Sequence, residues 1–141
     1  MSGDAMGPEE FMKRLAGLCA SGVGPGMPRR LRDAQILLAS MALCFKPGMR
    51  YTEREVGEVL QGWLEAAGPR VDLDHASMRR ALVDGRFLDR DAPGTTYQLS
   101  ASNPDRIPPI WEGLDPLRIL QEARANAERR KQSMRSGQPP P

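Results

Sequence analysis

The stretch SMRRALVDGRFLDRDAPGTTYQL, residues 77–99, changes its pattern half-way along. Met78, Ala81 and Leu82 are spaced as on one face of a helix, and Gly85 follows as a residue that commonly ends one. The second half has two short runs with aromatic and β-branched residues on either side of an Ala-Pro-Gly turn, which is typical of a β-hairpin. The stretch therefore predicts a helix that leads directly into a hairpin.

Two further helices and a short strand are predicted before this stretch. Residues 29–45 place apolar side chains on more than one side of a helix, so they are expected to form the central helix of the core. Thr52 and Glu55 form a capping box at the start of a second helix over residues 53–66, and residues 49–51 are expected to pair as a short strand. The order helix, strand, helix, helix, strand, turn, strand is that of a winged helix-turn-helix.

We therefore expect a mainly α fold with a small β-hairpin (α+β), in which a winged helix-turn-helix core is flanked by N- and C-terminal helices. The length of 141 residues allows one such domain. Composition and Pro/Gly spacing divide the chain into five segments. They are an N-terminal helix with a Gly/Pro linker (residues 1–27), the winged-helix domain (28–100), a Pro-rich connector (101–114), a C-terminal helix (115–135) and a disordered tail (136–141).

Several classes of protein are excluded by what the sequence contains. Two cysteines, Cys19 and Cys44, and the single His75 are too few for a structural zinc site, and nothing marks the chain as secreted, so a disulfide is not expected. No apolar run is long enough to cross a membrane, and a cytoplasmic location is expected. Asp72 and Asp74 are interpreted as helix caps, so we predict no catalytic residues, no metal, no cofactor and no enzymatic activity.

The charges of the chain are nearly balanced. The formal net charge is +2, and residues 28–100 carry 11 basic against 10 acidic side chains. The predicted third helix and hairpin contain five aspartates and four arginines, which repel phosphate unless the aspartates act as caps or ion-pair partners. A protein that binds nucleic acid with such a composition must use a local basic patch.

Two motifs resemble the DUF2087 family of small prokaryotic domains: LCFKPGMRYTEREVGEVL, residues 43–60, and DHASMRRALVDGRFLDRDAPGTTYQL, residues 74–99. The matching positions are Phe45, Pro47, Gly48, Tyr51, Thr52, Glu55, Val56, Asp74, Arg79, Arg80, Leu82, Val83, Asp84, Arg90, Asp91, Gly94 and Tyr97. The resemblance implies a winged helix found in transcriptional regulators and proposed to bind nucleic acid, without a catalytic role. The insert EAAGPRVDL, residues 65–73, departs from the pattern and lengthens the turn of the helix-turn-helix.

The expected function is DNA binding by a non-enzymatic, transcription-related protein, with double-stranded DNA as the partner. The candidate nucleic-acid contacts are polar and basic residues of the third helix, the residue after it and the start of the first helix: Ser77, Arg79, Arg80, Arg86, Arg29 and Arg30. Arg79 and Arg80 have a second interpretation, in which they pair with Asp84 or with a glutamate of the second helix.

The alternative function is a winged-helix protein-protein interaction module that does not bind DNA. Mixed charges on the third helix and hairpin suit a protein partner as well as a nucleic acid. Apolar residues on the terminal helices offer faces for a homodimer or another protein: Leu15, Leu18, Leu117 and Leu120.

Overall fold

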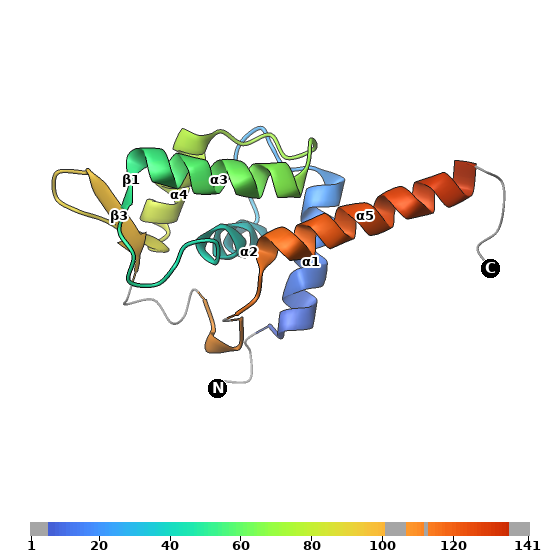
Figure 1. Cartoon of the computed structure of the whole chain (residues 1–141), viewed down its shortest axis with the longest axis horizontal. Helices are drawn as coiled ribbons and strands as arrows, with labels where there is room; N and C mark the ends of the chain where they lie inside the picture. The colour runs from blue at the N-terminus through green and yellow to red at the C-terminus, as the bar shows by residue number, and fades with distance from the viewer. Residues whose placement is uncertain (1–5, 101–106, 112, 136–141) are drawn as a thin grey trace.

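The computed structural model describes residues 6–100, 107–111 and 113–135. The elements follow one another as α1 (Pro8–Ser21), α2 (Leu31–Ala42), β1 (Tyr51–Thr52), α3 (Glu53–Ala67), α4 (His75–Asp84), β2 (Leu88–Arg90), β3 (Thr96–Leu99), the 3-10 turn η2 (Pro109–Trp111) and α5 (Pro116–Arg135). The fold is mainly α with a small antiparallel sheet, and α2 to β3 have the order of a winged helix-turn-helix (Figure 1). The predicted fold class is confirmed.

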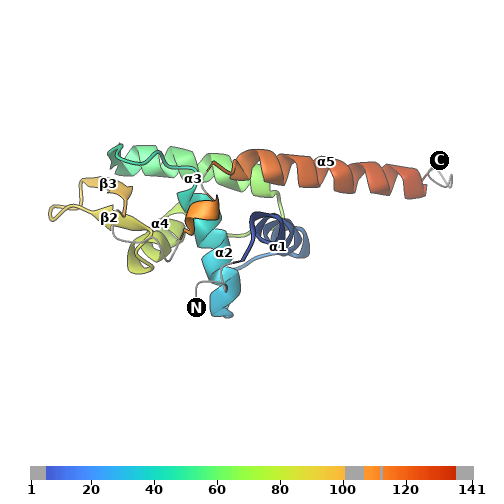
Figure 2. The same ribbon diagram turned by 90° about the horizontal axis from the view of Figure 1, so that it is seen from below.

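The three strands form an antiparallel sheet in the order β1-β3-β2. Tyr97 in β3 is paired with Tyr51 on one side and with Arg90 on the other. The expected strand at residues 49–51 starts later, at Tyr51, because a turn occupies the residues before it: Gly48 has a φ of +78°, and the Met49 amide donates to the Lys46 carbonyl (3.3 Å). β2 and β3 form the predicted hairpin, which extends from one end of the molecule (Figure 2).

A single hydrophobic core joins all of the helices. Trp63 on α3 is fully buried, and its indole Nε1 donates to the hydroxyl of the buried Ser40 on α2 (2.9 Å). The Ser40 hydroxyl in turn donates to the Leu37 carbonyl (2.7 Å), so both buried polar groups are hydrogen-bonded. The core therefore forms around α2, as the apolar pattern of residues 29–45 predicts.

Both terminal helices pack into this core. Phe11 and Leu15 on α1 and Leu120 on α5 are at most 1% exposed. The Phe11 ring stacks on Trp111 with 4.2 Å between centroids, and the Trp111 indole donates to the Met6 carbonyl (2.7 Å). These contacts hold α1, the η2 turn and the first half of α5 against the rest of the core.

The connection between α1 and α2 binds the connection between α3 and α4. Val23, between α1 and α2, forms a parallel bridge with Val71, between α3 and α4. The Val23 amide donates to the Arg70 carbonyl (3.0 Å), and the Asp72 amide donates to the Val23 carbonyl (2.7 Å). The longer turn that the sequence predicts before α4 is therefore held by the Gly/Pro segment that precedes α2.

The first turn of α4 is capped by Asp74, while Asp72 is exposed and does not cap the helix. The Asp74 carboxylate accepts hydrogen bonds from the Ser77 amide (2.7 Å) and the Ser77 hydroxyl (2.8 Å). These hydrogen bonds hold the pKa of Asp74 below its usual range, and the one from the Ser77 amide has the largest effect. At α3 the predicted capping box is present, with Thr52 and Glu55 each accepting from the other's amide.

Candidate nucleic-acid interface

A polar hollow of about 370 Å³ lies between α4 and the hairpin, against the first residue of α3. Its charged lining consists of three arginines and two acids: Arg79, Arg80, Arg90, Glu53 and Asp84. The turn of the hairpin, residues 92–94, forms another wall. Because α4 follows the turn of the helix-turn-helix, this hollow lies where a winged helix presents its recognition helix and wing.

Arg79 is held by an ion pair inside the hollow. Its Nη2 lies 3.3 Å from Oε1 of Glu53, and the Arg79 side chain is only 25% exposed. Of the two interpretations of Arg79, the ion pair with a glutamate of the second helix is the one that the structure contains. Glu53 is exposed, and ion pairs with an exposed member contribute only about 0–1 kcal/mol to stability.

Arg80 and Arg90 are the arginines of the hollow that remain unpaired. Both are exposed, and neither forms an ion pair with a residue that the structure describes. Arg80 extends from α4 and Arg90 from the end of β2, beside Gly94 in the hairpin turn. Sequence reasoning missed Arg90, because a hairpin arginine among aspartates has the pattern of a local ion pair. Its position next to the Pro-Gly turn, opposite the third helix, was the available signal.

The other candidate contacts lie outside the hollow. Ser77 is half-buried, and its amide and hydroxyl both donate to Asp74, so its hydroxyl proton is already used in the helix cap. Arg29 and Arg30 are exposed before the first turn of α2, and Arg86 is exposed between α4 and β2. The structure thus brings Arg79 and Arg80 together with Arg90, and it does not bring the remaining candidates to the same place.

Arg86 occupies a backbone conformation that L-residues rarely adopt, with φ at +63°. The Phe87 amide donates to the Leu82 carbonyl (2.8 Å) and the Arg86 amide to the Val83 carbonyl (3.1 Å), which is the Schellman pattern at a helix end. Glycine is the usual residue at the position of Arg86. Gly85 precedes it with φ at −81°, so the glycine that the sequence assigns to the helix end does not supply the left-handed turn.

Gly85 has a packing role instead. A Cβ atom on Gly85 would lie 3.0 Å from the Ala81 carbonyl oxygen and 3.2 Å from the Phe87 ring. A side chain at residue 85 would therefore be tightly packed against the Phe87 ring and the end of α4, while the positive φ of the turn falls on Arg86.

Replacing Arg86 with glycine is expected to stabilise the protein by about 1 kcal/mol, because glycine adopts a positive φ without the steric cost of a Cβ. The measurement is the free energy of unfolding in urea. Arg86→Ala is the matched control, since it removes the same charge and keeps the Cβ. Equal stability of the glycine and alanine variants would contradict the strained turn.

Asp91 organises the hairpin turn. Its carboxylate accepts from the backbone amides of Thr95 (2.7 Å) and Thr96 (3.1 Å) and from both threonine hydroxyls (2.9 Å each). These hydrogen bonds hold the pKa of Asp91 well below its usual range, and the one from the Thr96 amide has the largest effect on the pKa. The carboxylates of Asp91 and Asp74 therefore both accept hydrogen bonds from neighbouring residues of the chain.

The sequence model of one protein family matches residues 26–99 of the chain, more than half of its length. That family is described as an uncharacterized protein conserved in bacteria (DUF2087). The chain belongs to the DUF2087 family. The DUF2087 segment contains α2, the sheet, α3 and α4, and so the whole hollow, whereas α1 and α5 lie outside it. No curated protein and no solved structure matches the chain.

Other reactive side chains near the DUF2087 segment have structural environments. His75 begins α4, and its Nε2 lies 2.8 Å from Oε1 of Gln61 on α3. Burial raises the pKa of Cys19 and of Cys44 to about 12, with the Asp115 charge adding to the effect at Cys44, so both thiols are protonated at neutral pH.

Residues 6–100, 107–111 and 113–135 contain neither a candidate metal site nor a candidate membrane span. No group of three or more His, Cys, Asp or Glu side chains there is placed to hold a metal ion. Within the same ranges, no helix combines the length and the apolar character that a membrane span needs.

Proposed function

We propose that the DUF2087 segment binds double-stranded DNA through the hollow between α4 and the hairpin, as a non-enzymatic, transcription-related module of the cytoplasm. The observation that carries this proposal is the convergence of Arg80 and Arg90, both exposed and unpaired within the described structure, on the two sides of one hollow. Arginine offers a planar fork of donors that fits phosphate oxygens and the O6/N7 edge of guanine.

The electrostatic balance of the hollow supports weak and salt-sensitive binding. Its lining carries three arginines against Glu53 and Asp84, which leaves one net positive charge. Entry of a phosphate next to Arg79 displaces Glu53 from its ion pair, and Arg79 then adds a contact to those of Arg80 and Arg90. Binding is therefore expected to depend on a few phosphate contacts rather than on the field of the whole protein, whose net charge is only +2.

A second candidate function is binding of a protein with mixed charges. The observation that favours it is that positively and negatively charged side chains line the same hollow. Glu53 and Asp84 can accept hydrogen bonds from a protein partner, whereas a nucleic-acid backbone rarely offers donors. Loss of salt-dependent DNA binding would favour this alternative.

Replacing both Arg80 and Arg90 with glutamine is expected to weaken the salt dependence of DNA binding. The negative slope of the logarithm of the binding constant K against log salt concentration becomes shallower by up to about 2, since each lost phosphate contact removes about 0.9. The measurement is fluorescence anisotropy of a labelled random-sequence DNA duplex across a salt series. The folded state is checked by the urea transition of each variant.

The matched control removes two exposed basic residues, Lys13 and Arg14, from α1 in the variant Lys13→Gln with Arg14→Gln. α1 lies on the opposite side of α2 from α4 and the hairpin (Figure 2), so this variant changes the net charge equally and leaves the hollow intact. Absence of salt-dependent binding by the unmodified chain, or equal slopes for the two double variants, would be incompatible with the proposal.

A further inference from the structure

The C-terminal half of α5 extends beyond the core as a free-standing helix. Arg124 contacts the end of α3, where its Nη1 donates to the Glu65 carbonyl (2.9 Å). We call residues 125–135, which follow it, the α5 arm. Figures 1 and 2 both show the arm continuing away from the other helices, at the end of the molecule opposite the hairpin.

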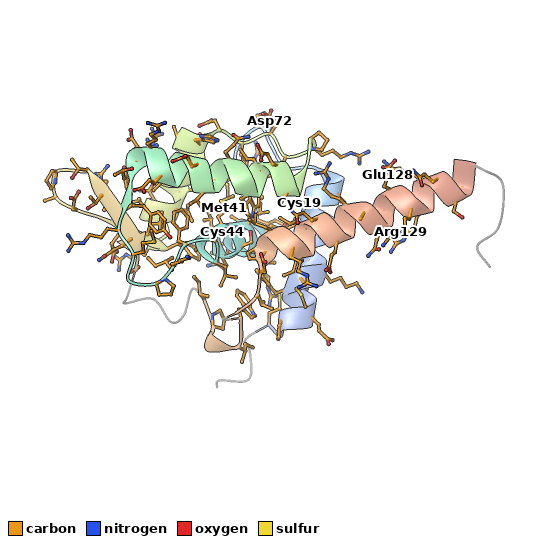
Figure 3. All side chains as sticks on the ribbon, in the orientation of Figure 1. Cys19, Met41, Cys44, Asp72, Glu128 and Arg129 are labelled. Carbon is orange, nitrogen blue, oxygen red and sulfur yellow. The ribbon has the colours of Figure 1, made fainter. Side chains whose placement is uncertain are left out.

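The α5 arm concentrates positive charge. It contains four basic residues and one acid: Arg129, Arg130, Lys131, Arg135 and Glu128. The arm thus has a net charge of +3 within a chain whose net charge is +2, so the rest of the protein is slightly negative. Figure 3 shows Glu128 and Arg129 on different sides of the arm, both directed away from the core.

The arm lacks the features of a helix that docks by apolar contacts. Its large apolar side chain is Met134, which is 82% exposed and stands alone among polar residues and alanines. A second copy of the chain would need a repeating apolar stripe along the arm, and a membrane surface would need an apolar face to insert. The remaining source of affinity is electrostatic, and a polyanion with regularly spaced charges fits it.

We propose that the α5 arm is a second contact for nucleic acid, which binds the phosphate backbone of a duplex without reading its sequence. The proposal deepens the proposed function and rests on it for the identity of the polyanion, but the contact is separate from the hollow. Because the arm and the hairpin lie at opposite ends of the molecule, the two contacts engage different stretches of duplex and add to the salt dependence independently (Figure 1).

The test is carried out on the full chain with Arg130 and Lys131 both replaced by glutamine. Glutamine has nearly the helix propensity of arginine and lysine, so the arm remains helical while two charges are removed. The expected result is that the negative slope of log K against log salt concentration becomes shallower by about 2 for a random-sequence duplex. Lys13→Gln with Arg14→Gln is again the control with the same loss of charge.

The outcomes separate this inference from the proposed function. If the slope becomes shallower for the arm variant and not for Arg80→Gln with Arg90→Gln, the arm contact is supported and the contact at the hollow is overturned. If it becomes shallower only for Arg80→Gln with Arg90→Gln, the arm contact is overturned. An arm variant that behaves like the α1 control overturns the inference. A second probe, vesicles of phosphatidylserine and phosphatidylcholine, overturns it if the arm variant loses vesicle binding while duplex binding is unchanged.

Discussion

A chain cut to residues 26–99, the DUF2087 segment alone, is expected to lose its cooperative unfolding transition. The cut removes four large side chains that are nearly or completely buried in the full chain: Phe11, Leu15, Trp111 and Leu120. Each such side chain contributes about 1.5–3 kcal/mol by its burial. Their sum is comparable with the whole stability of a small domain, about 5–15 kcal/mol.

The remaining segment would also expose the surfaces that these residues cover. α1 packs on α2 and α3, and α5 packs on α3, so removal of both uncovers two sides of the core. The measurement is circular dichroism during urea unfolding. The control is a chain that ends at residue 126, which loses most of the α5 arm and keeps Leu120 and Arg124. A sharp transition for residues 26–99 would show that α1 and α5 are accessory.

Replacing Gly24 with alanine is expected to lower the free energy of unfolding by about 3 kcal/mol, through backbone strain and a steric clash. Gly24 has φ at +111°, a conformation that favours glycine. An added Cβ would lie 2.3 Å from the Asp72 carbonyl oxygen, which belongs to the backbone. The segment paired through Val23 and Val71 must therefore separate to accommodate it.

Gly26→Ala is the control for Gly24→Ala. Gly26 also has a positive φ, +83°, but a Cβ there would meet no atom within 4 Å. Gly26→Ala is expected to lower the free energy of unfolding by only about 1 kcal/mol, because the added side chain is strained by the positive φ but meets no other atom. Both variants are compared in urea denaturation. Equal losses of stability would contradict the proposed close approach of Gly24 to the chain before α4.

Local sequence patterns predicted the elements of this protein well because each depends on neighbours in the chain. The Thr52–Glu55 capping box, the Asp74 cap and the hairpin turn all form between residues at most a few positions apart, and the structure contains all three. Hydrophobic periodicity likewise predicted the core helices, since one helix face determines which side chains are buried. The two motifs that resemble the family, residues 43–60 and 74–99, both lie within the match over residues 26–99.

The arrangement of the candidate site depends on contacts that are distant in sequence. Arg79 pairs with Glu53, 26 positions earlier, and Arg90 reaches the hollow only because the hairpin folds back beside α4. The turn after α4 shows the same limit within one segment. A Cβ on Gly85 would lie 3.2 Å from the Phe87 ring, and the left-handed position falls on Arg86 rather than on the glycine that the sequence assigns to the helix end.

The sequence alone determined the order of elements, the capping box of α3 and the winged-helix class, because these follow from hydrogen bonds and periodicity within short stretches. Only the tertiary structure decided that α1 and α5 complete the core, that the connections before α2 and before α4 hold each other through Val23 and Val71, and which arginines pair with acids among the described residues. The physical reason is that ion pairs and packing between elements depend on distances in space. Those distances are set when separate apolar faces are buried together.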